Sequence, residues 1–289
     1  MAGLELLALS TILFSFSMGY HYAGAVVGSA YGGRAVRLRL GLVMASVLVL
    51  IGTLATPVSR TYSNLYSGSF DGYSSILLGS FIATSIATYL KIPTSTIQIF
   101  TFSALASALV GDGSLSIGIL AVLMVSWVLA PVLSYTMAPL IMRITPNKKW
   151  PLLLVMVFSA LVLGTNDIGM AASFLGEKGL SRHYAAIMAG FSASLGLVVW
   201  GSRLVKLVGD ELGIHGERRF LAAQSTKIAI LLILNSLGLN ASMNQTLIGA
   251  LAGLGARGKI IRNILMGWAL SPVLGLALSM LVYLLLNIY

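Results

Sequence analysis

One acidic side chain lies deep in an apolar stretch of this sequence. Asp167 falls within residues 164–169, which read Gly-Thr-Asn-Asp-Ile-Gly, whereas the other Asp and Glu residues lie in polar stretches or near the N-terminus. A carboxylate among apolar residues is costly unless it is paired, protonated or bound to a cation, and the flanking glycines allow a helix to break and free its carbonyls. The Thr165 hydroxyl, the Asn166 amide and Asp167 therefore form a candidate cation site. The alternative is a neutral Asp167 that closes a helix kink.

A second set of polar residues carries hydroxyls and amides and occurs twice. Residues 93–98 read Pro-Thr-Ser-Thr-Ile-Gln, with Thr94 or Ser95 as a helix N-cap, and residues 240–246 read Asn-Ala-Ser-Met-Asn-Gln-Thr. Two helix N-termini that face each other would bind an oxyanion through free N–H groups, without a buried arginine. The alternative is ordinary capping of two short helices. The candidate anion ligands are Thr94, Ser95, Thr96, Gln98, Ser242, Asn244, Gln245 and Thr246.

A histidine lies in a glycine-rich stretch near the N-terminus. Residues 19–24 read Gly-Tyr-His-Tyr-Ala-Gly, and more glycines follow at positions 28, 32 and 33. Such a run indicates close helix packing or a helix break. His21 could carry protons or contribute to the cation site, although a lone helical histidine more often has a structural hydrogen bond.

The composition indicates that these residues are held by membrane helices. Hydrophobic residues make up 57% of the chain and charged residues 9%, against about 25% charged in a soluble domain, and the mean hydropathy is +0.94. There is no cysteine, which excludes disulfides and thiolate metal sites. Ten apolar segments are predicted as helices, at about 4–32, 40–56, 74–90, 93–110, 117–142, 151–175, 184–202, 220–237, 240–256 and 263–288. The fourth and ninth are short, at roughly 25 Å as helices, so they either span or re-enter the membrane.

The basic residues predict the orientation of these segments. The net charge of +10 lies mainly in alternate short loops, which argues against nucleic-acid binding. If every segment crosses the membrane, the positive-inside rule places both termini outside the cell membrane. The predicted cytoplasmic residues are Arg34, Arg37, Arg39, Lys91, Arg143, Lys148, Lys149, Arg203, Lys206, Arg218, Arg219, Arg257, Lys259 and Arg262.

The two halves of the chain resemble each other. Residues 127–133 and 268–274 share Trp, Leu, Pro, Val and Leu in register, and Ser95 and Gln98 match Ser242 and Gln245. We predict two repeats, residues 1–146 and 147–289, each with five segments. An odd number of crossings inverts the second repeat, which is typical of secondary transporters with a site where the repeats meet. The predicted fold is all-α and integral to the membrane.

At these motifs the chain resembles the inorganic phosphate transporter (PiT) family of cation-coupled carriers. That family has a Gly-Ala/Ser-Asn-Asp-Val-Ala-Asn motif and a Gly-Leu-Pro-Val-Ser-Thr-Thr-His motif in each half. Residues 164–169 are similar to the first motif, and residues 90–98 and 238–246 to the two copies of the second. The resemblance implies coupling sodium ions at the Asn/Asp motifs and phosphate at the hydroxyl motifs.

The chain departs from the family at several motif positions. In the first half, the family's Asn, Asp and second Asn correspond to His21, Tyr22 and Ala25, so one full cation site remains, at Asp167. The other departures are Met170, Ile97, Met243 and Asn244, and the motif's histidine is Gln98 and Gln245.

Several functions fit these observations. The leading one is a secondary transporter of inorganic phosphate, coupled to Na⁺ or H⁺, with no other cofactor. The alternatives are a permease for sulfate or a related oxyanion, and a non-transporting membrane sensor or partner subunit. An intramembrane hydrolase that uses Asp167 and His21 ranks last, because the sequence has no paired carboxylates and no nucleophile–base or HExxH motif. We therefore expect no enzyme; the expected partners are the anion and membrane lipid, and a homodimer is left open.

Overall fold

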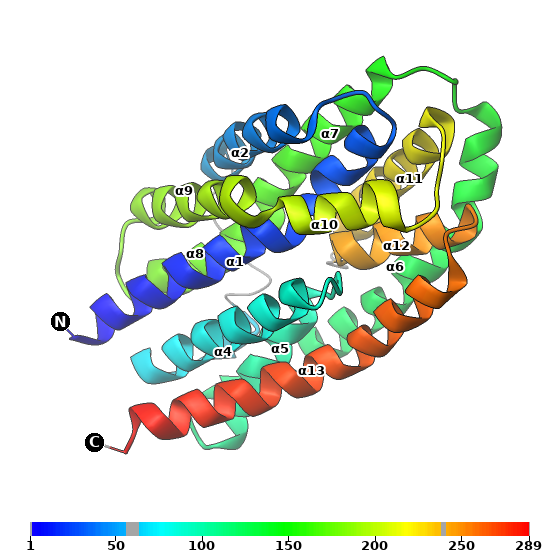
Figure 1. The fold of residues 1–289 in the computed structure, drawn as a ribbon. Helices are drawn as coiled ribbons and strands as arrows, with labels where there is room; N and C mark the ends of the chain where they lie inside the picture. The colour runs from blue at the N-terminus through cyan, green and yellow to red at the C-terminus, as the bar shows by residue number, and fades with distance from the viewer. Residues whose placement is uncertain (1, 56–63, 238–240, 289) are drawn as a thin grey trace.

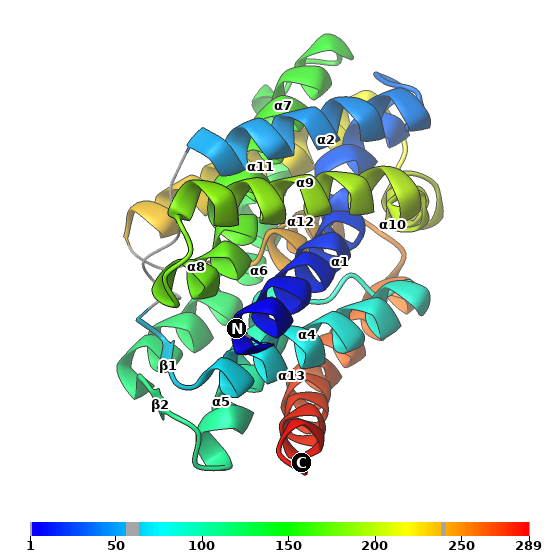
Figure 2. The same ribbon diagram turned by 90° about the vertical axis from the view of Figure 1, so that its left-hand side faces the viewer.

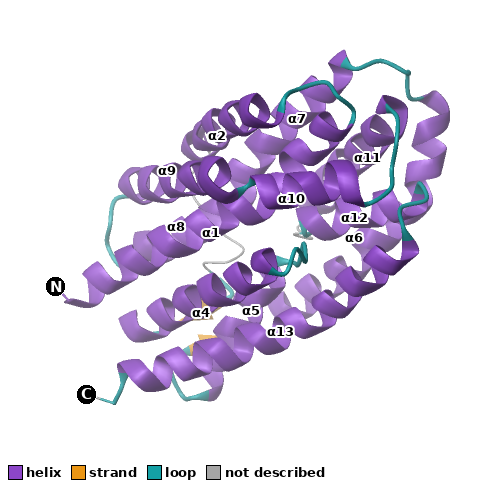
Figure 3. Cartoon of the chain, in the orientation of Figure 1, coloured by secondary structure: helices purple, strands orange, loops and turns teal. Residues whose placement is uncertain are grey.

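The computed structural model describes residues 2–55, 64–237 and 241–288, and these residues are almost entirely helical (Figure 3). The only strands among them, β1 (Tyr66–Ser67) and β2 (Ser114–Leu115), form a short antiparallel pair. The α-helices are α1 (Ala2–Gly32), α2 (Leu38–Ala55), α4 (Phe70–Tyr89), α5 (Thr96–Leu109), α6 (Ile117–Ile144), α7 (Trp150–Val162), α8 (Gly169–Glu177), α9 (Arg182–Trp200), α10 (Ser202–Lys206), α11 (Glu217–Ser236), α12 (Met243–Gly253) and α13 (Gly258–Leu286). Two π-helical segments, η1 (Leu163–Ile168) and η2 (Leu207–Glu211), follow α7 and α10.

The predicted all-α membrane fold is confirmed. Within the described residues, six helices are long and apolar enough to cross a membrane: α1, α2, α6, the α7–η1–α8 rod, α9 and α13. All ten predicted segments correspond to helices, but α5 has only 14 residues and α12 only 11. At about 1.5 Å per residue, neither reaches across a hydrocarbon layer about 30 Å thick.

The short helices belong to two hairpins that enter from opposite ends of the molecule. The α4–α5 hairpin starts and finishes at the end where both termini lie, and the α11–α12 hairpin starts and finishes at the other end (Figure 1). The view turned by 90° shows α1 in the middle of the bundle, with α9 and α4 on either side of it (Figure 2). A hairpin returns to its own side, so the loops outside the two hairpins keep the sides predicted from ten crossings. Lys91, predicted in a cytoplasmic loop, instead lies in the turn between α4 and α5.

One prediction was wrong: residues 203–211 are not a loop. The chain continues from α9 through α10 and η2, because charged residues alternate with apolar ones that pack inward. Lys206 is exposed, whereas the apolar side chains on the other face are buried, namely Leu204, Val205, Leu207 and Val208.

Small residues let several helices approach at backbone distance. A Cβ added at Gly19 of α1 would overlap the carbonyl of Ala193 in α9, and one added at Gly196 of α9 would overlap the carbonyl of Phe16 in α1. Gly164 of η1 lies against the backbone of α2 in the same way. Packing of this kind is typical of membrane helices, whose close contact depends on residues without bulky side chains.

The basic loops that connect α1 to α2, α6 to α7 and η2 to α11 lie at one end of the molecule, opposite the termini (Figure 1). We predict that this end is cytoplasmic. The chain has no cysteine, so single cysteines can be introduced at exposed Asn64, which precedes β1, and at exposed Asn147, in the loop between α6 and α7. In intact cells, an impermeant maleimide should label Asn64→Cys, and label Asn147→Cys only after permeabilisation. The reverse pattern would invert the predicted orientation.

Candidate functional site

The two predicted helix starts are real and carry serine caps. Ser95 caps α5 by accepting a hydrogen bond from the Gln98 backbone N–H at 3.2 Å. Ser242 caps α12 in the same way, accepting from the Gln245 backbone N–H at 3.5 Å. Both serines are fully buried. The structure therefore selects Ser95 rather than Thr94 as the first cap.

The two helix starts touch each other inside the protein. The Asn244 side-chain amide donates to the Thr94 carbonyl at 2.9 Å, and the Gln245 amide donates to the Gln98 side-chain carbonyl at 3.1 Å. From this contact, α5 and α12 run in opposite directions (Figure 1). Two positive helix ends with buried hydroxyls and amides thus converge, as an anion site made of neutral groups requires.

The anion-site candidates are not all equally available. The Thr246 hydroxyl donates to the Ser242 carbonyl of its own helix at 2.7 Å. Gln245 has its side-chain oxygen buried and without a hydrogen-bond partner among the described residues. An unsatisfied buried acceptor is costly, so this oxygen is suited to accept a hydrogen bond from a bound molecule.

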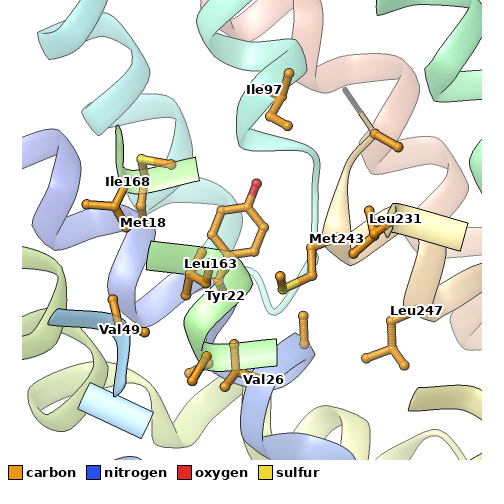
Figure 4. Packing of buried hydrophobic residues seen from close by; sticks show 14 of the residues in the cluster. Met18, Tyr22, Val26, Val49, Ile97, Leu163, Ile168, Leu231, Met243 and Leu247 are labelled. Atoms are coloured by element: carbon orange, nitrogen blue, oxygen red, sulfur yellow. The ribbon is translucent and has the colours of Figure 1, made fainter. Parts of the chain in front are cut away.

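Tyr22 connects this site to Asp167. Its hydroxyl lies 2.6 Å from the Thr96 hydroxyl and donates to the Asp167 carboxylate at 3.1 Å. The ring is buried among apolar residues of several helices, as Figure 4 shows for Met18, Val49, Ile97, Leu163, Ile168 and Met243. The candidate anion and cation sites therefore lie next to each other, although the sequence places Thr96 and Asp167 far apart.

Asp167 lies on a widened turn rather than on a broken helix. The chain passes from α7 into η1 and on to α8 without leaving the helical path. The expected break is thus a π-helical bulge, a distortion that is frequent at functional sites. Asp167 is buried, whereas Thr165 and Asn166 are half-buried, and the Thr165 hydroxyl bonds to the Val162 carbonyl at 3.2 Å and to the Asn166 side-chain oxygen at 3.3 Å.

His21 faces the first helix start. One ring nitrogen lies 2.7 Å from the Thr88 hydroxyl, and the other lies 3.1 Å from the Thr94 carbonyl. No hydrogen bond joins His21 to Asp167 in the part of the chain that the structure describes. This arrangement supports the structural role of His21, which fixes the end of α4 and the start of α5 to α1.

Sequence reasoning did not single out Tyr22 as a link, nor Lys227 and Gln224 as site residues. Lys227 is fully buried in α11, and its ammonium group donates to the Ala25 carbonyl and to the Ser159 hydroxyl. The sequence contained a sign of the role of Lys227, because it is a basic residue within an apolar segment. Asp167 was singled out for the corresponding reason, as an acidic residue within an apolar segment.

The η1 segment contains the oxygen types that a monovalent cation prefers, in the side chains of Thr165, Asn166 and Asp167. One carboxylate with hydroxyl, amide and carbonyl oxygens is the kind of set that holds Na⁺ in membrane carriers. Among the described residues, no group of three or more His, Cys, Asp or Glu side chains could hold a metal ion.

Comparisons with known proteins identify the family and the fold of the chain. A model of the phosphate transporter family matches residues 18–158 and 163–289. A protein of Methanocaldococcus jannaschii assigned as a phosphate permease is 25% identical over 286 residues, which cover 92% of each chain. The chloroplastic inorganic phosphate transporter 2-1 of Arabidopsis thaliana is 28% identical over 99 residues, which are 32% of this chain and 17% of that protein. A solved structure named as the sodium-dependent phosphate transporter shares the fold, with a TM-score of 0.83, 18% identity and 99% coverage of both chains.

Proposed function

Since the chain belongs to the phosphate transporter family, we propose that it is a secondary transporter that carries inorganic phosphate across the membrane together with a cation. The observation that carries the proposal is the meeting of the capped starts of α5 and α12 beside a single buried carboxylate. The anion would bind at Thr94, Ser95, Thr96, Gln98, Ser242, Asn244, Gln245 and Thr246.

Phosphate fits the site better than sulfate. At neutral pH phosphate carries a proton on one oxygen, so it donates as well as accepts hydrogen bonds, whereas sulfate only accepts. The unpartnered Gln245 oxygen is a buried acceptor that phosphate satisfies and sulfate leaves unpaired. A site with a group for a substrate hydrogen bond discriminates strongly against an analogue that lacks it.

The coupling cation would bind at Asp167, with oxygens from Thr165 and Asn166. Sodium is our first choice, supported by the donor set and by the structural relative, which is named as sodium-dependent. A proton on Asp167 is the second choice. Uptake driven by a pH gradient in the absence of sodium would favour the proton.

Removing the capping hydroxyls tests the anion site. In liposomes that contain the purified protein, Ser95→Ala and Ser242→Ala should each weaken phosphate uptake by about 10- to 150-fold in affinity, because a hydroxyl donor to a charged ligand contributes about 1.5–3 kcal/mol. Ser192→Ala is the matched control, since among the described residues the hydroxyl of this buried serine bonds to the Met188 carbonyl of its own helix and to no other partner.

The control should transport like the parent. If both capping variants transport phosphate with parental affinity, the anion binds elsewhere. If the parent accumulates sulfate in preference to phosphate, the substrate assignment is wrong but the site is not.

A further inference from the structure

Lys227 is a buried cation whose contacts are neutral oxygens. Its side chain has 0% exposure, and in the described part of the chain no other Lys or Arg is buried to this degree. The ammonium nitrogen lies 2.7 Å from the Ala25 carbonyl oxygen and 2.9 Å from the Ser159 hydroxyl oxygen. The salt bridge found among the described residues lies elsewhere, between Lys91 and Glu211.

The surroundings of the ammonium group are built to present oxygen atoms to it. Ser159 donates its own proton to the Val155 carbonyl at 2.6 Å, so its oxygen is free to accept. The Gln224 amide donates to the Ala25 carbonyl at 3.1 Å and to the Ser159 hydroxyl at 2.9 Å, and so holds both acceptors in place. Carbonyl and hydroxyl oxygens that converge on one point in a membrane protein also make a sodium site.

This point lies next to the proposed transport site. Ala25 is one helical turn beyond Tyr22, whose hydroxyl donates to Asp167. Lys227 and Asp167 are both buried, and no salt bridge joins them among the described residues. Tyr22 and Ala25 are also the positions at which the first motif of the family has an Asp and an Asn. The chain therefore has a buried lysine side chain next to the positions at which the motif has lost its Asp and Asn.

We propose that the Lys227 ammonium group is a tethered cation that permanently occupies the position of one coupling cation. The protein then needs one fewer bound coupling ion to transport its anion than it would need without the lysine. The consequence for transport rests on the proposed function. The claim about cation binding can be tested separately, in protein without phosphate.

A purely structural role for Lys227 makes a different prediction. As a brace between α11, α1 and α7, its removal would lower stability and leave the number of bound sodium ions unchanged. As a tethered cation, its removal opens a position that sodium can fill. The number of sodium ions bound per protein therefore separates the two roles.

The test counts sodium in purified protein without phosphate, by binding of radioactive sodium at saturation. Lys227→Ser, which replaces the ammonium group with a hydroxyl, should bind one more sodium ion per protein than the parent. Lys206→Ser is the control, because Lys206 is an exposed lysine of α10, and it should bind the parental number. A folded Lys227→Ser protein with the parental sodium count overturns the proposal.

A second variant keeps the test decisive if Lys227→Ser does not fold. Tyr22→Asp restores the carboxylate of the motif and leaves Lys227 in place to neutralise it. We expect this variant to bind the parental number of sodium ions, and an additional sodium ion would overturn the proposal. Phosphate uptake by the parent is a separate measurement, and its failure would refute the proposed function without altering either sodium count.

Discussion

Asp167→Asn should reduce sodium-driven phosphate accumulation in liposomes by about 100-fold or more. Asp167 is linked through the Tyr22 hydroxyl to Thr96 at the start of α5, and loss of the charged partner of a bound ion typically costs about 3 kcal/mol of binding free energy or more, which is roughly 100-fold. Asparagine keeps the shape of the side chain and an oxygen that can accept the Tyr22 hydrogen bond. The loss should therefore appear in transport and not in folding.

The control for this experiment is Asp71→Asn, which changes an acid in the first turn of α4, away from the site. It should transport like the parent. Size-exclusion profiles and melting temperatures of both variants should match the parent. If Asp167→Asn still accumulates phosphate against its gradient, Asp167 only stabilises the π-helical turn, and the coupling cation binds elsewhere.

Gly19→Val should prevent assembly of the bundle or lower its melting temperature more than any surface substitution. The new side chain would overlap the backbone of α9 at Ala193, and a carbonyl cannot rotate away as a side chain can. Overpacking a core typically costs about 1–3 kcal/mol, and a clash with backbone belongs at the upper end or beyond it. Gly196→Val should do the same from the α9 side, against Phe16.

Gly118→Ala is the matched control for the glycine series. Gly118 is also a helical glycine, in α6, but a Cβ added there meets nothing within 4 Å. Alanine should be neutral or stabilise by up to about 1 kcal/mol. Thermal unfolding followed by size-exclusion chromatography would rank the variants. Parental melting of Gly19→Val would mean that α1 and α9 can separate without loss of the fold.

The sequence predicted the helices and the helix starts well, for physical reasons. Apolar length identifies a membrane segment almost without tertiary context, and a serine followed three residues later by glutamine is a local capping pattern at both Ser95 and Ser242. Asp167 was recognised because a buried carboxylate has few ordinary explanations. The division into two repeats at residue 146 stays a prediction, and that position falls in the loop between α6 and α7.

Other features depend on contacts that no local pattern encodes. Tyr22 was interpreted only as a lost aspartate, yet its hydroxyl links Thr96 to Asp167. Lys227 was counted as a charge within a segment, but its partners, Ala25 and Ser159, lie on two other helices. The charged residues Arg203 and Lys206 led to the prediction of a loop. They instead lie on one face of α10, so a helix can carry charges that were expected only in loops.

The opposed directions of α5 and α12 bear on which way the carrier runs. Each helix presents its positive end to the same point, and from there α5 runs toward the end of the molecule where the termini lie, whereas α12 runs toward the opposite end (Figure 1). In the proposed carrier, an anion that arrives from either compartment meets a positive helix end at the middle of the membrane, and the protein has no energy source of its own. The direction of net flow is then set by the ion gradients alone, and a reversed gradient should turn the same molecule from an importer into an exporter.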